Sequence, residues 1–204
     1  MKRGKFITFE GIDGAGKSTH VAWATDLLRG RGVGLVVTRE PGGTILGEHL
    51  RRILLAGDER IHAETETLMM FTARRQHLEE VIRPALQRGN WVLCDRFTDA
   101  SFAYQGGGRG VPKEKLEALE RWVHPDLQPD LTLLFDVSAE LGQSRVASSK
   151  SADRFEREDA AFFSRVRNAY LERLQQWPNR IVRIDGSKPI ADIRREVERH
   201  LLIK

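Results

Sequence analysis

The chain has 204 residues, of which 40% are hydrophobic and 30% charged. This length suits one α/β domain, spanning residues 1–204, with one sizeable core. No stretch approaches the roughly 18 apolar residues of a membrane span, and Glu10 ends the first apolar run too early for a secretory signal. The single cysteine, Cys94, excludes an internal disulfide, and the six histidines show no metal-ligand spacing. We therefore expect a cytoplasmic protein without a membrane segment or a structural zinc site.

The formal net charge of +4 favours anionic partners, either nucleic acid or phosphorylated small molecules. The arginines are scattered instead of forming one basic tail, and aromatic residues make up only 7% of the chain. This pattern favours small phosphorylated ligands and predicts no nucleic-acid partner, although a nucleic-acid binder is one alternative to keep in view.

The first half of the chain alternates strand-like and helix-like segments. In order, we expect a strand at Phe6–Phe9, a helix at Thr19–Arg29, a strand at Leu35–Thr38, helices at Leu46–Leu55 and Ala63–Leu86, and a strand at Trp91–Cys94. Pro84 should mark the last turn of the long helix or a kink in it.

The second half continues the alternation. It predicts a helical turn at Ala100–Tyr104 before the glycines 106–108, a helix from Pro112 to Val123, a strand at Leu131–Phe135, helices at Ala139–Ala147 and Asp159–Gln176, a strand at Ile181–Ile184 and a closing helix at Ile190–Leu202. Five strands separated by helices predict an α/β fold, with a five-stranded parallel sheet flanked by helices on both faces. In such a sheet, ligands bind beyond the carboxyl ends of the strands.

The first of these strand ends carries E-G-I-D-G-A-G-K-S-T, which matches the phosphate-binding pattern G-x-x-x-x-G-K-[ST]. Three glycines let the backbone turn tightly and bring several N–H groups onto phosphate oxygens, and the following helix directs its positive dipole end at the same anion. Lys17 would reach the β and γ phosphates and the Ser18 hydroxyl would take a Mg²⁺ position. The alternative is a glycine-rich turn that binds nothing.

Two further strand ends carry charged residues. Arg39, beside the turn formed by Pro41, Gly42 and Gly43, can clamp a second phosphate, unless it is only solvated. Asp95 can hold Mg²⁺ directly or through water while the adjacent Arg96 neutralises a transferring phosphoryl group; the alternative is a structural salt bridge between them. The strand ends together predict a site for two phosphorylated ligands.

The motifs E-G-I-D-G-A-G-K-S-T, T-R-E-P-G-G-T, L-M-M-F-T-A-R-R, C-D-R-F and A-Y-Q-G-G-G-R-G, in this order, resemble those of the bacterial thymidylate kinases, relatives of the nucleoside monophosphate kinases. The resemblance covers nearly the whole chain. It implies a P-loop kinase fold with a short lid at about residues 145–155, an ATP and Mg²⁺ requirement, conversion of dTMP to dTDP and a homodimer.

The same resemblance assigns site residues. It implies ATP binding by the residues Gly11, Ile12, Asp13, Gly14, Ala15, Gly16, Lys17, Ser18, Thr19 and Arg145, and Mg²⁺ binding by Ser18 and Asp95. It implies dTMP binding by the residues Asp13, Arg39, Arg51, Phe71, Arg74, Arg96, Ser101, Tyr104 and Gln105.

Several of these implied roles are specific. Phe71 would stack on thymine and Arg74, one helical turn later, would read the base, although Phe71 can instead be a core residue. Ser101 and Gln105 would face the pyrimidine edge, and Tyr104 would fill the space of a ribose 2′-OH. Asp13 would bind the sugar 3′-OH, while the residues Arg39, Arg51 and Arg96 would surround the acceptor phosphate.

Catalysis in such a site needs charge stabilisation and positioning, and no strong base, because the acceptor phosphate oxygen is already anionic. We expect Lys17, Arg96, Mg²⁺ and a lid cation to supply it. The lid reads R-V-A-S-S-K-S-A-D-R-F-E, with fewer arginines than related lids, so either Lys150 or Arg154 can be that cation. Arg145 can instead stack on adenine, and the whole cluster can also be a solvated loop.

Three other functions compete with this one. The closest is a kinase for another deoxynucleoside monophosphate or a deoxynucleoside. A nucleotide-hydrolysing switch protein is disfavoured because the chain has no N-K-x-D motif and its third strand ends in D-R-F. A nucleic-acid binder is the third.

Overall fold

The computed structural model describes residues 3–56, 60–146 and 154–202. Its centre is a five-stranded sheet in the order β2-β3-β1-β4-β5, in which every neighbouring pair is parallel. The strands are β1 (Phe6–Glu10), β2 (Leu35–Arg39), β3 (Trp91–Asp95), β4 (Leu131–Asp136) and β5 (Ile181–Asp185). The predicted parallel sheet is confirmed, and each strand extends one residue beyond its predicted end.

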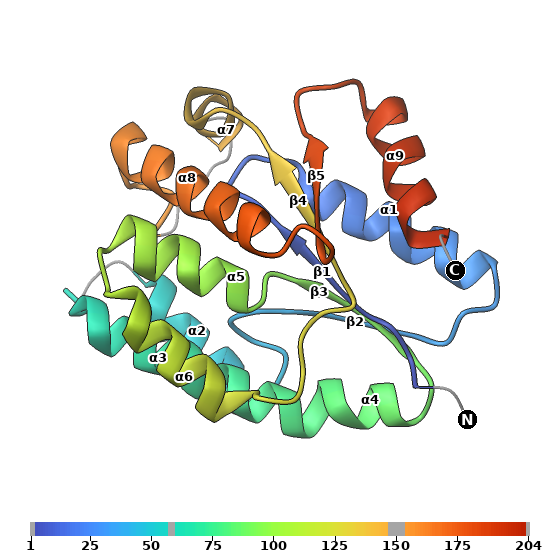
Figure 1. Cartoon of the computed structure of the whole chain (residues 1–204), viewed down its shortest axis with the longest axis horizontal. Helices are drawn as coiled ribbons and strands as arrows, with labels where there is room; N and C mark the ends of the chain where they lie inside the picture. Colours follow the sequence, from blue (N-terminus) through green and yellow to red (C-terminus); the bar gives the residue numbers. More distant parts are fainter. Residues whose placement is uncertain (1–2, 57–59, 147–153, 203–204) are drawn as a thin grey trace.

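Helices cover both faces of the sheet (Figure 1). α1 (Lys17–Gly30) and α9 (Ile190–Leu202) lie together on one side. The helices on the other side are α4 (Arg83–Gln87), α5 (Thr98–Ser101), α6 (Lys113–Val123) and α8 (Ala160–Gln176). α2 (Ile45–Leu55) packs against α3 (Ala63–His77), and α7 (Ala139–Val146) follows β4. One hydrophobic cluster contains buried residues of α1, α8 and α9, and a second contains buried residues of α4 and α6.

The long helix predicted at 63–86 is interrupted. It consists of α3, a π-helical turn η1 (Leu78–Ile82) and α4 (Arg83–Gln87). Proline has no N–H and its ring clashes with the carbonyl four residues before it, so Pro84 cannot continue a regular α-helix. The π turn directly before Pro84 absorbs this defect, as expected for a proline kink.

The segment predicted as a short turn before three glycines is more regular than expected. α5 (Thr98–Ser101) runs directly into a second π-helix, η2 (Phe102–Gly108), which includes the glycines. A Cβ at Gly107 would lie 2.6 Å from the Ala169 Cβ, and one at Gly108 would lie 2.5 Å from the Phe162 ring. These two glycines are therefore what lets η2 pack directly on α8.

The carboxyl ends of the strands meet at one edge of the sheet. Arg39 of β2 and Phe9 of β1 both pair with Asp95 of β3, and Glu10 of β1 pairs with Leu134 of β4. Residues that follow the strands are thereby gathered into one region. Among the described helices, none is both long and apolar enough to cross a membrane.

Candidate functional site

The glycine-rich loop between β1 and α1 adopts the conformation that its sequence predicts. Gly14 and Gly16 have positive φ angles of 76° and 90°, and a Cβ at Gly14 would lie only 2.1 Å from the Gly142 carbonyl oxygen of α7. The glycines therefore serve both the turn and a close approach to α7. Gly16 immediately precedes α1, so the helix begins at Lys17 and directs its amino end toward the loop.

Lys17 is buried and folds back over this loop. Its Nζ donates hydrogen bonds of 2.9 Å to the carbonyl oxygens of Gly11 and Ile12. Burial, followed by the positive charge of Arg96, lowers the pKa of Lys17 to about 8. Ser18 and Thr19 are exposed beside it.

Arg145, at the end of α7, lies against the other side of the loop. Its guanidinium donates to the Gly14 carbonyl oxygen and to the Gly186 carbonyl oxygen, each at 3.2 Å. This position connects the loop to the segment after β5. It is compatible with the predicted contact to the nucleotide donor.

Arg96 lies between the glycine-rich loop and a pocket beside it. It has a positive φ of 69°, which is uncommon for a residue with a side chain. Its guanidinium donates to Gly11 O at 2.8 Å, to Asp13 Oδ1 at 2.5 Å and to the Tyr104 hydroxyl at 3.0 Å. Arg96 thus pairs with Asp13 and not with its neighbour Asp95, which disfavours the alternative of a structural Asp95–Arg96 salt bridge.

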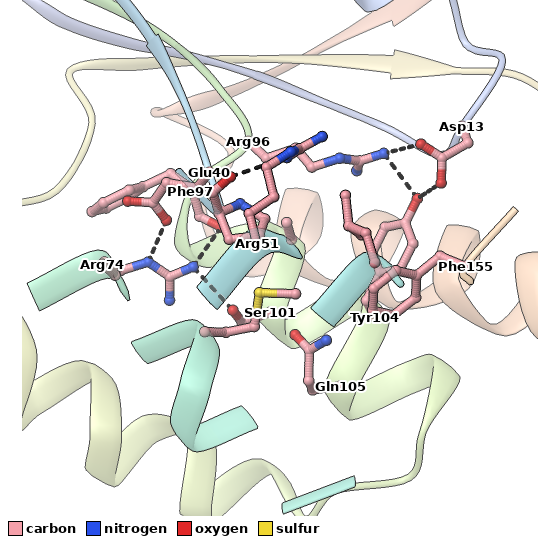
Figure 2. A pocket seen from close by; sticks show the side chains of 14 residues that line it. Asp13, Glu40, Arg51, Arg74, Arg96, Phe97, Ser101, Tyr104, Gln105 and Phe155 are labelled. Atoms are coloured by element: carbon pink, nitrogen blue, oxygen red, sulfur yellow. Dashed lines mark hydrogen bonds and ion pairs between the residues drawn. The ribbon is translucent and has the colours of Figure 1, made fainter. Parts of the chain in front are cut away.

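Asp13 completes a triangle with Arg96 and Tyr104 (Figure 2). The Tyr104 hydroxyl donates to Asp13 Oδ2 at 2.7 Å, and the Arg96 guanidinium stacks over the Tyr104 ring at 4.7 Å. Burial alone would raise the pKa of Asp13, but the charges of Arg96 and Lys17 lower it below its usual value. Asp13 is therefore a carboxylate at neutral pH, aimed between the loop and the pocket.

The pocket that Arg96, Asp13 and Tyr104 line has a volume of about 100 Å³. Its lining includes seven of the nine predicted dTMP-binding residues, namely Asp13, Arg51, Arg74, Arg96, Ser101, Tyr104 and Gln105. They come from the loop after β1, from α2 and α3, from the segment after β3, and from α5 and η2. Elements far apart in the sequence thus supply one pocket, as their positions beyond the strand ends predict.

Arg74 is a buried residue of this pocket that makes three side-chain hydrogen bonds. Its Nε donates to Glu40 Oε2 at 2.7 Å, and its Nη2 donates to Phe97 O at 3.1 Å and to Ser101 Oγ at 3.0 Å. His77 Nδ1 lies 3.0 Å from the other Glu40 oxygen. Burial would raise the pKa of Glu40, but Arg74 and His77 lower it. Among the described residues, Arg74 Nη1 is a buried nitrogen without a hydrogen-bond partner.

Phe71 does not line this pocket. It lies next to Arg74, whose guanidinium is 4.6 Å from the ring centre, so the predicted helical neighbourhood is confirmed. However, Phe71 is only 2% exposed and belongs to the core cluster with Leu78 and Ile82, which agrees with the alternative that it is a core residue. Met70, one position earlier, lines the pocket in its place.

The two remaining phosphate-clamp candidates differ in position. Arg51 lines the pocket and donates to the Pro41 carbonyl oxygen at 3.0 Å. Arg39 lies outside the pocket, half exposed, and its Nη2 is 3.0 Å from Glu48 Oε2. The structure therefore places Arg51, and not Arg39, in the lining of this pocket.

Arg39 instead lines a neighbouring cavity together with the two metal-ligand candidates, Ser18 and Asp95. Asp95 Oδ1 is buried without a hydrogen-bond partner in the described part of the chain. A carboxylate and a hydroxyl oxygen are hard ligands that suit Mg²⁺, which is bound by few protein groups when phosphates and water complete its shell. Across residues 3–56, 60–146 and 154–202, no cluster of three or more His, Cys, Asp or Glu side chains forms another metal site.

Of the two lid cations, Lys150 lies outside the described residues. Arg154 is described, and its Nη2 donates to Glu66 Oε2 at 2.5 Å while its Nε donates to Leu54 O at 2.9 Å. The next residue, Phe155, lines the same pocket as Arg74 and Tyr104. In this conformation Arg154 is held against α2 and α3.

Sequence reasoning missed Glu66, Met70 and Phe155. Glu66, Met70 and Arg74 are spaced by four residues on α3, so the helical spacing alone places them on one face, whereas the burial of Glu66 is visible only in the structure. Phe155 follows residues that have no periodic pattern, and its position depends on tertiary packing against Tyr104, whose ring centre is 5.6 Å away.

Comparison with known proteins relates the whole chain to one family. Residues 9–197 match the family model for thymidylate kinase. The thymidylate kinase of Methylobacillus flagellatus is 63% identical over 195 residues, covering 96% of this chain and 95% of the relative, and that of Cupriavidus taiwanensis is 61% identical over 201 residues, covering 98% of each.

A solved structure supports the same relationship. The crystal structure of thymidylate kinase from Ehrlichia chaffeensis superposes with a TM-score of 0.78 at 33% sequence identity, covering 98% of this chain and 99% of that chain. The sheet and its flanking helices therefore form the P-loop kinase fold. The chain belongs to the thymidylate kinase family, enzymes that phosphorylate dTMP to dTDP.

Proposed function

We propose that the protein transfers the γ-phosphoryl group of ATP, bound with Mg²⁺, to the phosphate of dTMP. The observation that carries this proposal is the position of Arg96. Its guanidinium contacts Gly11 of the phosphate-binding loop and also lines the acceptor pocket, so one cation lies between the two substrate sites. A charge at that position is where phosphoryl transfer needs stabilisation.

The donor site is formed by the loop residues Gly11, Ile12, Asp13, Gly14, Ala15, Gly16, Lys17, Ser18 and Thr19, with Arg145 beside the loop. Lys17 supplies positive charge to the β and γ phosphates. Ser18 and Asp95 would hold Mg²⁺, which would neutralise charge on the phosphate oxygens. The free oxygen of Asp95 supports this assignment.

The acceptor site reads the nucleotide at its base and its sugar. The side chains of Arg74, Ser101 and Gln105 meet the pyrimidine edge, and Met70 takes the apolar contact that we expected of Phe71. Asp13 accepts from the sugar 3′-OH, and the Tyr104 ring occupies the space of a 2′-OH. Arg51 and Arg96 bind the acceptor phosphate; Arg39 would have to leave Glu48 to do so.

No general base is needed, since the attacking phosphate oxygen is anionic near neutral pH. The protein positions the reactants and stabilises charge through Lys17 and Arg96, and Arg154 or Lys150 adds a further cation. Because Arg154 is bound to Glu66, it must exchange that partner for phosphate oxygens to take part.

A coupled assay of ATP consumption with dTMP, dUMP, dCMP, dGMP and UMP tests the substrate assignment. We expect dTMP to give the highest kcat/KM and UMP to react poorly because of Tyr104. Equal turnover of all five, or a preference for another deoxynucleotide, would replace the proposal with the nearest alternative, a kinase of different nucleotide specificity.

We also infer that the protein is a homodimer and works in the cytoplasm. Large apolar side chains are exposed on α2, α3 and α6, the most exposed being Ile45 at 81% and Trp122 at 80%. Leu46, Leu68 and Trp122 line one groove, whose remaining lining includes charged side chains, and exposed apolar side chains gathered with a polar surround are typical of an interface. Cys94 is buried and free, as suits a reducing compartment.

Light scattering coupled to gel filtration tests the dimer. We expect a mass near twice that of the chain, and a monomer for Trp122→Glu. A wild-type mass that stays monomeric at every concentration would refute the dimer.

A further inference from the structure

Glu66 of α3 is a buried carboxylate with three polar partners. It is fully buried, and Gln105 Nε2 donates to its Oε1 at 2.8 Å. Its Oε2 accepts from Arg154 Nη2 at 2.5 Å and lies 3.4 Å from Arg109 Nε. The carboxylate therefore connects the acceptor pocket to the base of the lid without lining the pocket itself.

The contact with Gln105 fixes the direction of an amide group. A carboxylate has no proton to donate and can only accept hydrogen bonds, so the NH₂ group of Gln105 must face Glu66. The amide oxygen is then the part of Gln105 that remains for a ligand. Figure 2 shows the carboxamide of Gln105 pointing into the pocket between Ser101 and Tyr104.

We propose that Glu66 is a positioning residue that sets the base selectivity of the acceptor pocket by fixing the orientation of the Gln105 carboxamide. With Glu66 in place, the pocket presents an acceptor, Gln105 Oε1, together with the donor guanidinium of Arg74, which lines the same pocket. This inference rests on the proposed binding of dTMP in the same pocket.

An acceptor beside a donor in the pocket distinguishes between bases by their hydrogen-bonding groups. Thymine and uracil carry an N3–H donor beside the O4 acceptor, which matches an acceptor and a donor in the pocket. Cytosine carries an N3 acceptor beside an N4 amino donor, so both contacts would be mismatched. A buried polar group left without a partner costs about 1–3 kcal/mol, so two mismatches give strong rejection of cytosine.

A purely structural role for Glu66 predicts something different. Were Glu66 needed only to neutralise Arg109 and Arg154, its loss would weaken all substrates alike. Arg109 provides the matched control, because it touches the same carboxylate and pairs with Glu158 at 2.5 Å, but does not line the pocket.

The test compares kcat/KM for dTMP and dCMP in the wild type, Glu66→Gln and Arg109→Gln. In Glu66→Gln the new amide can donate or accept, so Gln105 is free to turn over. We expect the wild type to prefer dTMP by about 100-fold or more, Glu66→Gln to lower this ratio at least about tenfold, and Arg109→Gln to keep it within about twofold. Equal losses for both nucleotides in Glu66→Gln would overturn the proposal.

A wild type that does not prefer dTMP would refute the proposed function itself, which separates the two failures.

A second measurement needs no substitution at Glu66. The side-chain NH₂ signals of Gln105, assigned from their loss in Gln105→Met, should exchange slowly with solvent and keep their shifts when dTMP binds. Large shifts or fast exchange would show that the NH₂ group faces the ligand and would overturn the proposal.

Discussion

Arg96 Nη2 lies 2.5 Å from Asp13 Oδ1, at the boundary between the phosphate-binding loop and the acceptor pocket. Both side chains are partly exposed, and both contact the Tyr104 hydroxyl. The ion pair with Asp13 therefore fixes the Arg96 guanidinium before either substrate binds. Charge stabilisation in the transition state requires this preorganisation.

Replacing Arg96 by Met should lower kcat by about 100- to 1000-fold, the usual effect of losing one preorganised donor. Arg96→Lys should recover only part of the activity, because an ammonium group has no planar fork to span Gly11 and Asp13. Steady-state kinetics measure this. Arg31→Met, which removes an arginine paired with Glu198 far along the sequence, is the control and should match the wild type.

The buried pair of Arg74 and Glu40 predicts a non-additive pattern of stability. Arg74→Gln or Glu40→Gln alone leaves an unpaired buried charge and should cost about 3–5 kcal/mol of unfolding free energy. The double substitution should regain most of this stability, because two amides can pair with each other, but not the activity with dTMP. Urea unfolding gives the free energies, and costs that simply add would contradict the prediction.

Asp95→Asn should raise the Mg²⁺ concentration needed for half-maximal rate by about tenfold, with little change in KM for dTMP. The reason is the free Asp95 oxygen in the cavity that Ser18 also lines. Asp26→Asn removes the same charge from an exposed position of that cavity and should leave the Mg²⁺ dependence unchanged. Identical Mg²⁺ curves for both variants would exclude Asp95 as a ligand.

Glu10 should make stability depend on pH. It is fully buried and accepts from Phe97 N and the Tyr170 hydroxyl, and burial together with the negative charge of Asp99 raises its pKa to about 8. Between the ordinary value of 4.5 and about 8, the folded state keeps a proton that the unfolded state has lost. This contribution to stability is complete below about pH 4.5 and declines as the pH rises to about 8.

Unfolding free energies measured from pH 5 to 8 should therefore fall faster for the wild type than for Glu10→Gln, by at most about 1.4 kcal/mol per pH unit. The amide has no proton to lose, so it removes this dependence. Parallel curves for the two proteins would show that Glu10 titrates normally.

The sequence predicted the sheet well because buried parallel strands are continuous apolar runs with glycine or proline nearby. Each strand was nevertheless predicted one residue short, since its last position is charged: Glu10, Arg39, Asp95, Asp136 and Asp185 still belong to the ladder. Two of these charged residues, Arg39 and Asp95, line the cavity that Ser18 also lines, so an apolar run ends before the residues that belong to the candidate site.

The site was predicted less completely than the sheet. The loop residues and Arg74 follow from local motifs, whereas the roles of Phe71 and Met70 depend on which side of α3 meets the core. Adjacent apolar residues on a helix differ by about 100° in direction, and the sequence alone does not say which direction is occupied. The partners of Glu66 come from two segments distant in the sequence, residues 105–109 and Arg154, so no local pattern could reveal them.

Gly107 and Gly108, at the contact between η2 and α8, support the pocket without lining it. A methyl group added at Gly107 or Gly108 meets Ala169 or Phe162, and the strain moves the helix that carries Tyr104 and Gln105. Variants at these positions would lose nucleotide discrimination with every pocket side chain unchanged. A survey of inherited or selected changes in this protein should therefore count these two glycines among the determinants of its substrate choice.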